Sequence, residues 1–438
     1  MQTPETHKNN DHSWRNDRVF WIILDIPFLL GLIYNFVMLP GFGPDEHRHF
    51  NYVKLLVTER RLPFLLPNGT EYHGAHTLHP PLYYLFLIPF YLVGRFLPGD
   101  AVWHVMRLGS LALCLASLVF IYVIAQKASS ERSVARFTVA LVGLLPIFGM
   151  TCGTINNDSS SIFAVAFFLW LLIVKFVDDD SPRAAVLIGL CLGLGMLCKA
   201  TVALCDGAAI LAYFLWRKDF RSSSAWRALM ITLVAGAIVA SPWYIRNFLL
   251  YGKFSPIENG FTNPALPAPS YGVLIMMMHP NFPPLFAYAN WGIFYSLWSQ
   301  KDWIPQNLRN PIYISLAVIC LIGLIGHARR WTQKYFHKEP ADNTGRVARV
   351  ACYSTFVLVW LACLWMAMFV HWGWAEGGRY LVASLVGLAV FVAYGWYCLL
   401  GSARLRLAIG IWCVLAVALN SLTIYWLLAF LNPTYGNH

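Results

Sequence analysis

Residues 19–40 read VFWIILDIPFLLGLIYNFVMLP, an apolar run with one charged side chain, Asp25. A helix of this length rises about 30 Å, which matches the hydrocarbon thickness of a bilayer. Further apolar stretches follow, and together they predict membrane helices near residues 19–40, 106–126, 137–153, 160–177, 184–198, 200–216, 228–245, 310–327, 350–370, 380–400 and 407–430. The sequence therefore predicts an all-α polytopic membrane protein with about 11 transmembrane helices.

The composition agrees with this class of protein. Of 438 residues, 58% are hydrophobic and 12% are charged, against roughly a quarter charged in an ordinary soluble domain. The net charge of +11 resides mostly in short loops between apolar runs, and no basic stripe with interleaved aromatic residues is present. This pattern excludes a nucleic-acid partner and indicates topology signals instead. The ten cysteines lie within or beside apolar runs, so we expect no disulfide framework.

Lysine and arginine alternate between loops, which predicts the orientation of the chain. The basic loops contain Lys127, Arg132, Arg136, Arg217, Lys218, Arg221, Arg227, Arg329, Arg330, Lys334, Lys338, Arg346, Arg349, Arg404 and Arg406. Because basic loops stay on the cytoplasmic side, we expect the N-terminus inside and two long outer loops, residues 41–105 and 246–309. The chain is expected to form one transmembrane domain, residues 1–438, without a separate soluble domain.

The apolar stretch 82–98 lies within the first outer loop. Pro89 interrupts it, it contains Arg95, and a crossing here would invert every later loop against the charge rule. We therefore expect a helix that lies in the membrane interface. The alternative is a twelfth crossing.

The first outer loop opens with Gly43-Pro44-Asp45-Glu46-His47-Arg48-His49-Phe50. Proline suits the first turn of a helix, and carboxylates there are favoured by the helix dipole. Asp45 and His49 are four residues apart, so a helix would present a carboxylate and an imidazole on one face. The simpler alternative is a helix cap with interfacial polar residues.

Three histidines end the same loop. His73, His76 and His79 are spaced by three, and two prolines stiffen the chain after His79. This spacing is compatible with a divalent metal held by His73, His76 and His79, with Asp45, Glu46 or His49 as further ligands. Of these residues, the candidate metal ligands are His49, His76 and His79. Against a metal, Gly74 and the prolines disrupt a regular helix, and the spacing matches no known zinc motif. No cofactor is therefore required.

Polar residues recur at the outer ends of later helices. They include Asn156-Asn157-Asp158, Lys199, Arg246-Asn247 and Arg379-Tyr380. The alternative for each arginine taken singly is interfacial snorkelling. Jointly, three cations on one face of the membrane are typical of a site for an anionic lipid headgroup.

Taken in order, these motifs resemble the GT-C superfamily of membrane glycosyltransferases. The resemblance rests on Pro44-Asp45-Glu46 with His49-Phe50, His79-Pro80-Pro81-Leu82-Tyr83-Tyr84, Lys199, Pro242-Trp243-Tyr244-Ile245-Arg246-Asn247 with Tyr251-Gly252, and Gly378-Arg379-Tyr380. It is nearest to bacterial relatives of protein O-mannosyltransferases and of lipid A aminoarabinose transferases.

The resemblance implies the GT-C fold and an inverting transfer of a sugar from a polyprenyl-phosphate donor to a hydroxyl acceptor. It implies catalytic roles for Asp45 as general base and Glu46 as its partner. It also implies that substrate is bound by His49, His79, Tyr83, Asp158, Lys199, Arg246, Asn247, Arg379 and Tyr380. The enzyme would be a multi-pass protein of the bacterial inner membrane, with its active site on the outer side.

Three other functions are alternatives for a chain with these features. A transporter or flippase of a lipid-linked anion would use the same cations, but it predicts ionisable residues at mid-membrane depth in several helices. An O-antigen ligase-like enzyme would use outer-loop arginines and a histidine in place of an Asp-Glu pair. A non-catalytic scaffold would need no clustered acidic pair.

Overall fold

The computed structural model describes residues 13–177, 179–217, 222–252, 254, 277–298, 306–337, 343–370 and 372–431. Within these residues the chain is all-α, as predicted, and the extended backbone amounts to one isolated bridge between Leu65 and Glu71. The α-helices are α1 (Arg18–Val37), α2 (Glu46–Thr58), α3 (Leu82–Gly94), α4 (Ala101–Ser129), α5 (Arg132–Gly143), α6 (Pro146–Cys152), α7 (Asp158–Trp170), α8 (Pro182–Cys198), α9 (Val202–Arg217), α10 (Ser223–Tyr251), α12 (Phe282–Trp298), α13 (Gln306–His337), α14 (Asn343–Trp365) and α15 (Leu385–Leu431). The short helices are Ser13–Asn16, Tyr72–Gly74, Leu171–Lys175, Met366–Val370 and Trp372–Ser384.

Each predicted membrane segment coincides with helical structure. Within the described residues, seven helices are long and apolar enough to cross a bilayer, or eight if α5 and α6 count as one bent crossing. Helices α8 and α9 are apolar but have only 17 and 16 residues, so they are shorter than these seven helices. The number of eleven crossings therefore stays a prediction.

Helix α15 is two helices joined at Gly401. Gly401 has φ +72° and ψ 170°, a conformation that favours glycine and breaks the helical ladder. The hydroxyls of Tyr397 and Ser402, one on each side of the break, both donate to the Glu131 carboxylate. This break separates the predicted segments 380–400 and 407–430.

The predicted helix 137–153 is wrong in one respect. It is not continuous: α5 and α6 meet at a bend of 70°. Pro146 begins α6, and Leu145 before it is extended with φ −71° and ψ 137°. A residue before proline is pushed out of the helical region, which explains the break.

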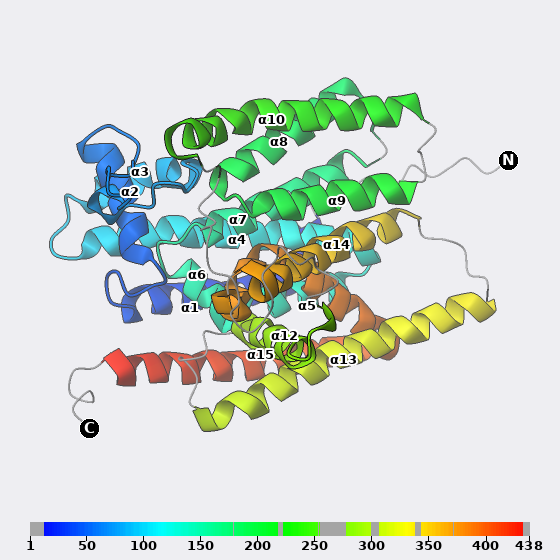
Figure 1. The fold of residues 1–438 in the computed structure, drawn as a ribbon. Helices are drawn as coiled ribbons and strands as arrows, with labels where there is room; N and C mark the ends of the chain where they lie inside the picture. The colour runs from blue at the N-terminus through cyan, green and yellow to red at the C-terminus, as the bar shows by residue number, and fades with distance from the viewer. Residues whose placement is uncertain are drawn as a thin grey trace.

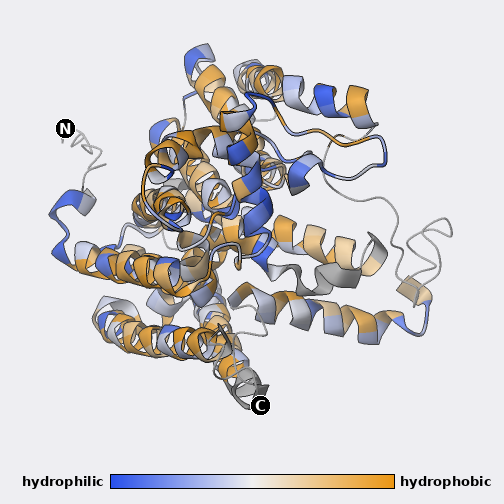
Figure 2. Ribbon diagram, turned by 90° about the vertical axis from the view of Figure 1, so that its left-hand side faces the viewer, coloured by the Kyte–Doolittle hydropathy of each residue, from blue (hydrophilic) through white to orange (hydrophobic). Residues whose placement is uncertain are grey.

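Outward faces of the helices are apolar, as lipid contact requires. On α1, Ile22, Leu29 and Phe36 are all exposed. Figure 2 shows hydrophobic residues along the helices, with hydrophilic residues concentrated toward helix ends and loops. These outward apolar faces are consistent with a membrane protein.

Helices α2 and α3 gather at one end of the bundle (Figure 1). Helix α3 has 13 residues and is about 20 Å long, too short to cross the bilayer upright. It packs on α4, where a side chain at Gly109 would collide with Leu87. These findings are compatible with an interfacial helix, which remains a prediction. Of the second outer loop, 246–309, residues 253, 255–276 and 299–305 lie outside the described residues, and α12 lies within it.

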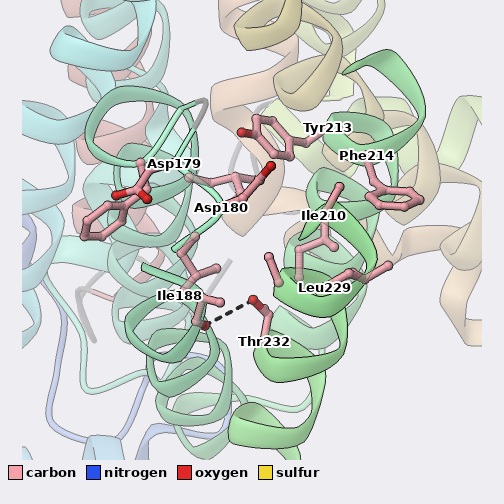
Figure 3. A pocket seen from close by; sticks show the side chains of 13 residues that line it. Asp179, Asp180, Ile188, Ile210, Tyr213, Phe214, Leu229 and Thr232 are labelled. Atoms are coloured by element: carbon pink, nitrogen blue, oxygen red, sulfur yellow. Dashed lines mark hydrogen bonds between the residues drawn. The ribbon is translucent and has the colours of Figure 1, made fainter. Parts of the chain in front are cut away.

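A small cavity lies between α8, α9 and α10, lined among others by Asp179, Asp180, Ile188 and Leu229 (Figure 3). Its volume is about 50 Å³, enough for a few waters and too small for a sugar or lipid headgroup. Thr232 at its wall donates to the Ala185 carbonyl at 3.1 Å. The cavity is at the N-terminal end of α8, so a helix length separates it from Lys199.

Candidate active site

Asp45 occupies the turn that begins α2. Its φ of +55° lies in the left-handed region, which non-glycine residues adopt rarely and often at functional positions. Gly43 before it has no room for a side chain, because a Cβ there would meet Thr154 at 2.8 Å. The tight turn leaves the Asp45 carboxylate 38% exposed. A charged, accessible carboxylate is thereby held at the end of the bundle.

Glu46, the next residue, is in the opposite environment. Its side chain is fully buried against Arg107 of α4, with nitrogen–oxygen distances of 2.7 and 2.8 Å. The same carboxylate accepts hydrogen bonds from the backbone N–H groups of Ile155 and Gly43. All of its hydrogen-bonding capacity is used inside the protein. This geometry favours a positioning role for Glu46 over the catalytic role predicted for it.

The N–H groups of the Arg107 side chain all donate hydrogen bonds as well. Its guanidinium donates to the carbonyls of Asn35, Met38 and Leu39 at 2.7, 2.7 and 2.9 Å. These carbonyls lie at the C-terminal end of α1, where helix carbonyls lack partners of their own. The buried pair thus joins the end of α1, α4 and the start of α2, and it fixes the turn that presents Asp45.

The Asp45 carboxylate faces two cations. Arg379, which is 334 positions away in sequence, donates to it at 3.2 Å, and Arg48 lies at 3.9 Å. Partial burial acts to raise the pKa of Asp45, but Arg379 and the neighbouring His76 and Arg48 outweigh it and lower the pKa. Asp45 is therefore ionised at neutral pH, as a base must be.

Lys199 and Asp158 form a second ion pair beside this one. Lys199 is the C-cap of α8, and Asp158 begins α7, so the two helix ends meet here. The Lys199 ammonium also lies 5.4 Å from the centre of the Tyr380 ring, and Arg379 lies 5.2 Å from the same ring. Asp45, Asp158, Lys199, Arg379 and Tyr380 therefore lie close together in the structure.

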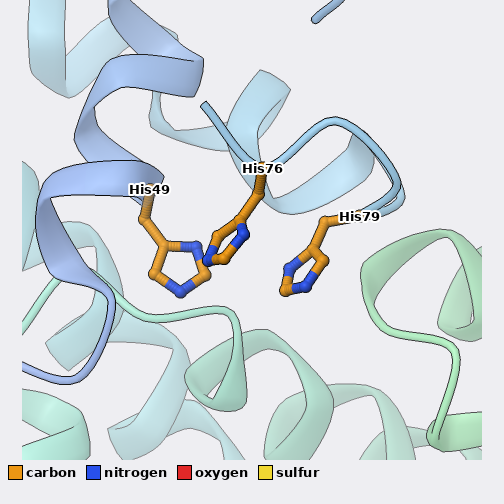
Figure 4. Close-up of side chains that lie close together, drawn as sticks. All are labelled: His49, His76 and His79. Carbon is orange, nitrogen blue, oxygen red and sulfur yellow. The ribbon is translucent and has the colours of Figure 1, made fainter. Parts of the chain in front are cut away.

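Three imidazoles complete the cluster (Figure 4). His49 comes from α2, and His76 and His79 come from the loop before α3. One ring nitrogen of each histidine can bind a metal, and these three nitrogens lie within 4.8 Å of one another. The rings of His76 and His79 are stacked, with centroids 4.0 Å apart. The third histidine of the sequence motif, His73, is exposed and pairs with Glu59 instead.

The imidazoles are held in their neutral form. Burial, reinforced by the other histidines and by Lys199, keeps the pKa values of His49 and His79 well below the usual value. Burial also lowers the pKa of His76, although a hydrogen bond to Glu71 opposes the shift. All three rings are therefore uncharged at pH 7.

The remaining predicted substrate residues lie around this cluster. Arg246 donates to the Pro63 carbonyl at 2.9 Å and to Asn247 at 2.8 Å, and Asn247 donates to Leu78 next to His79. They connect α10 to the first loop without contacting Asp45. Tyr83 is buried: its hydroxyl bonds with Ser110 and accepts from the Asn156 N–H, both at 2.8 Å. The geometry favours a structural role for Tyr83.

Sequence reasoning missed four members of the site. Arg107 stands inside an apolar helix, a signal that could have marked it. Glu71 pairs with Arg48 and lies 3.9 Å from His76. Tyr84 was quoted in the motif without a role, yet its hydroxyl lies 2.9 Å from His49 and 3.3 Å from His79. Asn157, whose amide lies 3.1 Å from His79, was part of a quoted cluster.

Residues 78–245 match the sequence profile of the family described as dolichyl-phosphate-mannose-protein mannosyltransferase. The chain is also similar in fold to the oligosaccharyltransferase of Archaeoglobus fulgidus, solved in complex with Zn and sulfate. The TM-score is 0.52 at 13% identity, over 93% of this chain and 52% of that one. The profile match covers less than half of the chain, and the structural match shows that the chain has the GT-C fold of this oligosaccharyltransferase.

A second structure of the Archaeoglobus fulgidus oligosaccharyltransferase AglB, in complex with an inhibitory peptide and a dolichol-phosphate, gives a TM-score of 0.51 at 12% identity. It covers 95% of this chain and 56% of that one. ArnT from Cupriavidus metallidurans bound to undecaprenyl phosphate aligns at a TM-score of 0.43 and 14% identity, over 90% and 79% of the two chains. The chain spans about half the length of these solved oligosaccharyltransferases. No curated protein matches it significantly in sequence.

Proposed function

We propose that this protein is an inverting glycosyltransferase of the GT-C superfamily. It transfers a hexosyl or pentosyl group from a polyprenyl-phosphate donor to a hydroxyl of a glycan, lipid or protein. The observation that carries the proposal is the pairing of the accessible Asp45 carboxylate with Arg379, beside Lys199, at one end of a GT-C bundle. The active site faces the outside of a bacterial inner membrane.

Asp45 is the general base. An ionised carboxylate is a weak base for a hydroxyl, so it accepts the proton late, when the bond to the anomeric carbon is well advanced. The proton passes from the acceptor hydroxyl to Asp45 while the sugar–phosphate bond breaks and its electron pair leaves with the phosphate. Attack opposite to the departing phosphate inverts the anomeric centre.

Arg379 and Lys199 stabilise the leaving group. Polyprenyl phosphate gains negative charge as it departs, and fixed cations in a poorly hydrated cleft stabilise that charge more than water would. Lys199 is 12% exposed and Arg379 33% exposed, so both are shielded without being closed off. Their present carboxylate partners hold them in place until the phosphate binds.

A lipid-linked donor explains why the site lies at the membrane surface. The donor's polyprenyl chain stays in the bilayer while its headgroup reaches the end of the bundle, where α2 and α3 gather (Figure 1). The dolichol-phosphate bound by AglB and the family description of the matched profile support a donor of this class. Neither the transporter nor the ligase alternative has comparable support.

Transfer by purified protein in nanodiscs tests the proposal. Wild type, Asp45→Asn and the control Asp100→Asn, an exposed aspartate of the same loop, are offered a panel of polyprenyl-phosphate sugars with a membrane extract as acceptor. Wild type and the control are expected to release polyprenyl phosphate, and Asp45→Asn to be roughly 10²- to 10⁴-fold slower. Donor binding without release under any acceptor condition would reject the transferase and favour lipid transport.

A further inference from the structure

The side chains of His49, His76 and His79 share one pattern of contacts at their ring nitrogens. Each ring has its Nδ1 directed at a protein group: His49 at the Tyr84 hydroxyl, His79 at Tyr84 and Asn157, and His76 at Glu71. The second nitrogen of each ring, Nε2, has no hydrogen-bond partner among the residues described. Metal-binding histidines are oriented in this way, with one nitrogen on a protein partner and the other on the metal.

The unpartnered nitrogen of His76 is the decisive observation. His76 is 6% exposed, and its Nε2 is buried with no hydrogen-bond partner in the described part of the protein. A buried polar atom left without a hydrogen-bond partner destabilises the folded protein. Its ring lies between those of His49 and His79, at centroid distances of 4.7 and 4.0 Å. The buried nitrogen therefore lies inside the histidine cluster.

We infer that these three histidines bind a divalent transition-metal ion of the Zn²⁺ class. Imidazole nitrogen suits zinc and its neighbours, whereas Mg²⁺ and Ca²⁺ require oxygen ligands. Three ligands around tetrahedral zinc lie about 3.3–3.4 Å apart, so these atoms, which lie within 4.8 Å of one another, must move closer, and the stacked rings of His76 and His79 must turn to direct both nitrogens at one ion. Three protein ligands leave a fourth position open, as in catalytic rather than structural zinc sites.

The charge of the surroundings favours a bound cation. The ion-paired side chains around the histidines balance, three against three: Asp45, Glu71 and Asp158, with Arg48, Lys199 and Arg379. An anionic phosphate headgroup bound beside this balanced set would therefore leave it with a negative charge. A divalent ion on the histidines would compensate for it. As a cofactor for sugar transfer, the metal rests on the proposed function, but its binding does not.

Metal content is measured separately from activity. Wild type, His76→Phe and His73→Phe are stripped with a chelator, incubated with Zn²⁺, passed through gel filtration and analysed for metal. His73 is the matched control because it is an exposed histidine of the same loop outside the cluster. Wild type and His73→Phe are expected to retain one ion per chain, and His76→Phe none. In Co²⁺-loaded wild type, the visible absorption bands of tetrahedral nitrogen coordination are expected and should be absent in His76→Phe.

His79→Phe provides the same test if His76→Phe does not fold, because His79 is only partly buried. A stripped wild type that retains no Zn²⁺, or a folded His76→Phe and His79→Phe that each retain a full equivalent, would overturn the inference. Excess Mg²⁺ should not displace the bound ion, and displacement would reject the metal class. Wild type that binds Zn²⁺ but never transfers sugar would refute the proposed function and leave the metal site intact.

Discussion

At the scale of single residues, the neighbouring carboxylates of Asp45 and Glu46 lie in different environments, and we expect them to have different roles. Asp45 is partly exposed and faces Arg379, whereas Glu46 is enclosed with Arg107. Removing one partner from a buried pair leaves an uncompensated charge, which typically costs 3–5 kcal/mol. Because both side chains carry a carboxylate, their different roles come from their different surroundings.

Glu46→Gln is therefore expected to lower the thermal stability of the protein strongly. Arg107→Met should have a similar effect, and the double variant should lose less than the sum of the two, because no charge is then left buried alone. Thermal unfolding in nanodiscs measures all three. Glu59→Gln, which breaks an exposed pair with Arg61, is the control and should cost about 0–1 kcal/mol. Strictly additive losses would contradict the coupling.

Lys199→Met is expected to weaken binding of polyprenyl phosphate. A hydrogen bond to a charged group contributes about 1.5–3 kcal/mol, so the Kd should rise roughly 10- to 150-fold. Lys54→Met, which changes an exposed lysine on α2, should leave the Kd unchanged. Equal affinity of the Lys199→Met variant and wild type would remove Lys199 from the donor site.

At the scale of helices, α8 and α10 approach closely through glycines. A Cβ at Gly189 would meet the Thr232 carbonyl at 2.4 Å, and one at Gly193 would meet the Gly236 carbonyl at 2.7 Å. Small residues permit this backbone contact between membrane helices. Because Lys199 caps the end of α8 and α10 contains Arg246, the contact sets the spacing of two groups at the site.

Gly189→Ala is expected to destabilise the protein and to reduce donor binding together, since α8 and α10 must move apart. Gly207→Ala in α9 is the matched control, because a Cβ there meets nothing within 4 Å. Alanine is also the better helix former by about 1 kcal/mol, so the control should be tolerated. Thermal unfolding and polyprenyl-phosphate binding measure both effects. Equal behaviour of the two variants would show that the contact does not position the site.

Much of the helical architecture could be predicted from apolar runs, since membrane helices must satisfy their own backbone groups. The bend before Pro146 was missed because hydrophobicity alone does not register a local break. Asp45, Lys199 and Arg379 could be grouped because each ends or follows an apolar run. The enclosure of Glu46 could not be foreseen, because it depends on Arg107, which is 61 positions away in sequence.

At the scale of the whole molecule, the site and the basic loops lie at opposite ends of the bundle. Asp17, just before α1, forms an ion pair with Arg136 of α5. Glu131 accepts hydrogen bonds from residues on both sides of the break in α15. These groups therefore lie at the same end of the bundle. In Figure 1 the end of α15 points to the side where α2 and α3 gather, whereas α1 begins at the other.

This arrangement predicts from which side the site can be reached. Asn68→Cys in the first loop and Ala403→Cys beside the break in α15 both replace exposed residues, and none of the ten native cysteines is exposed. A membrane-impermeant maleimide should label Asn68→Cys in intact spheroplasts and Ala403→Cys only after the membrane is opened. Labelling in the reverse order would place the site in the cytoplasm. Lipid-linked donors would then have to be used on the inner face, and the basic loops would lie outside against the charge rule.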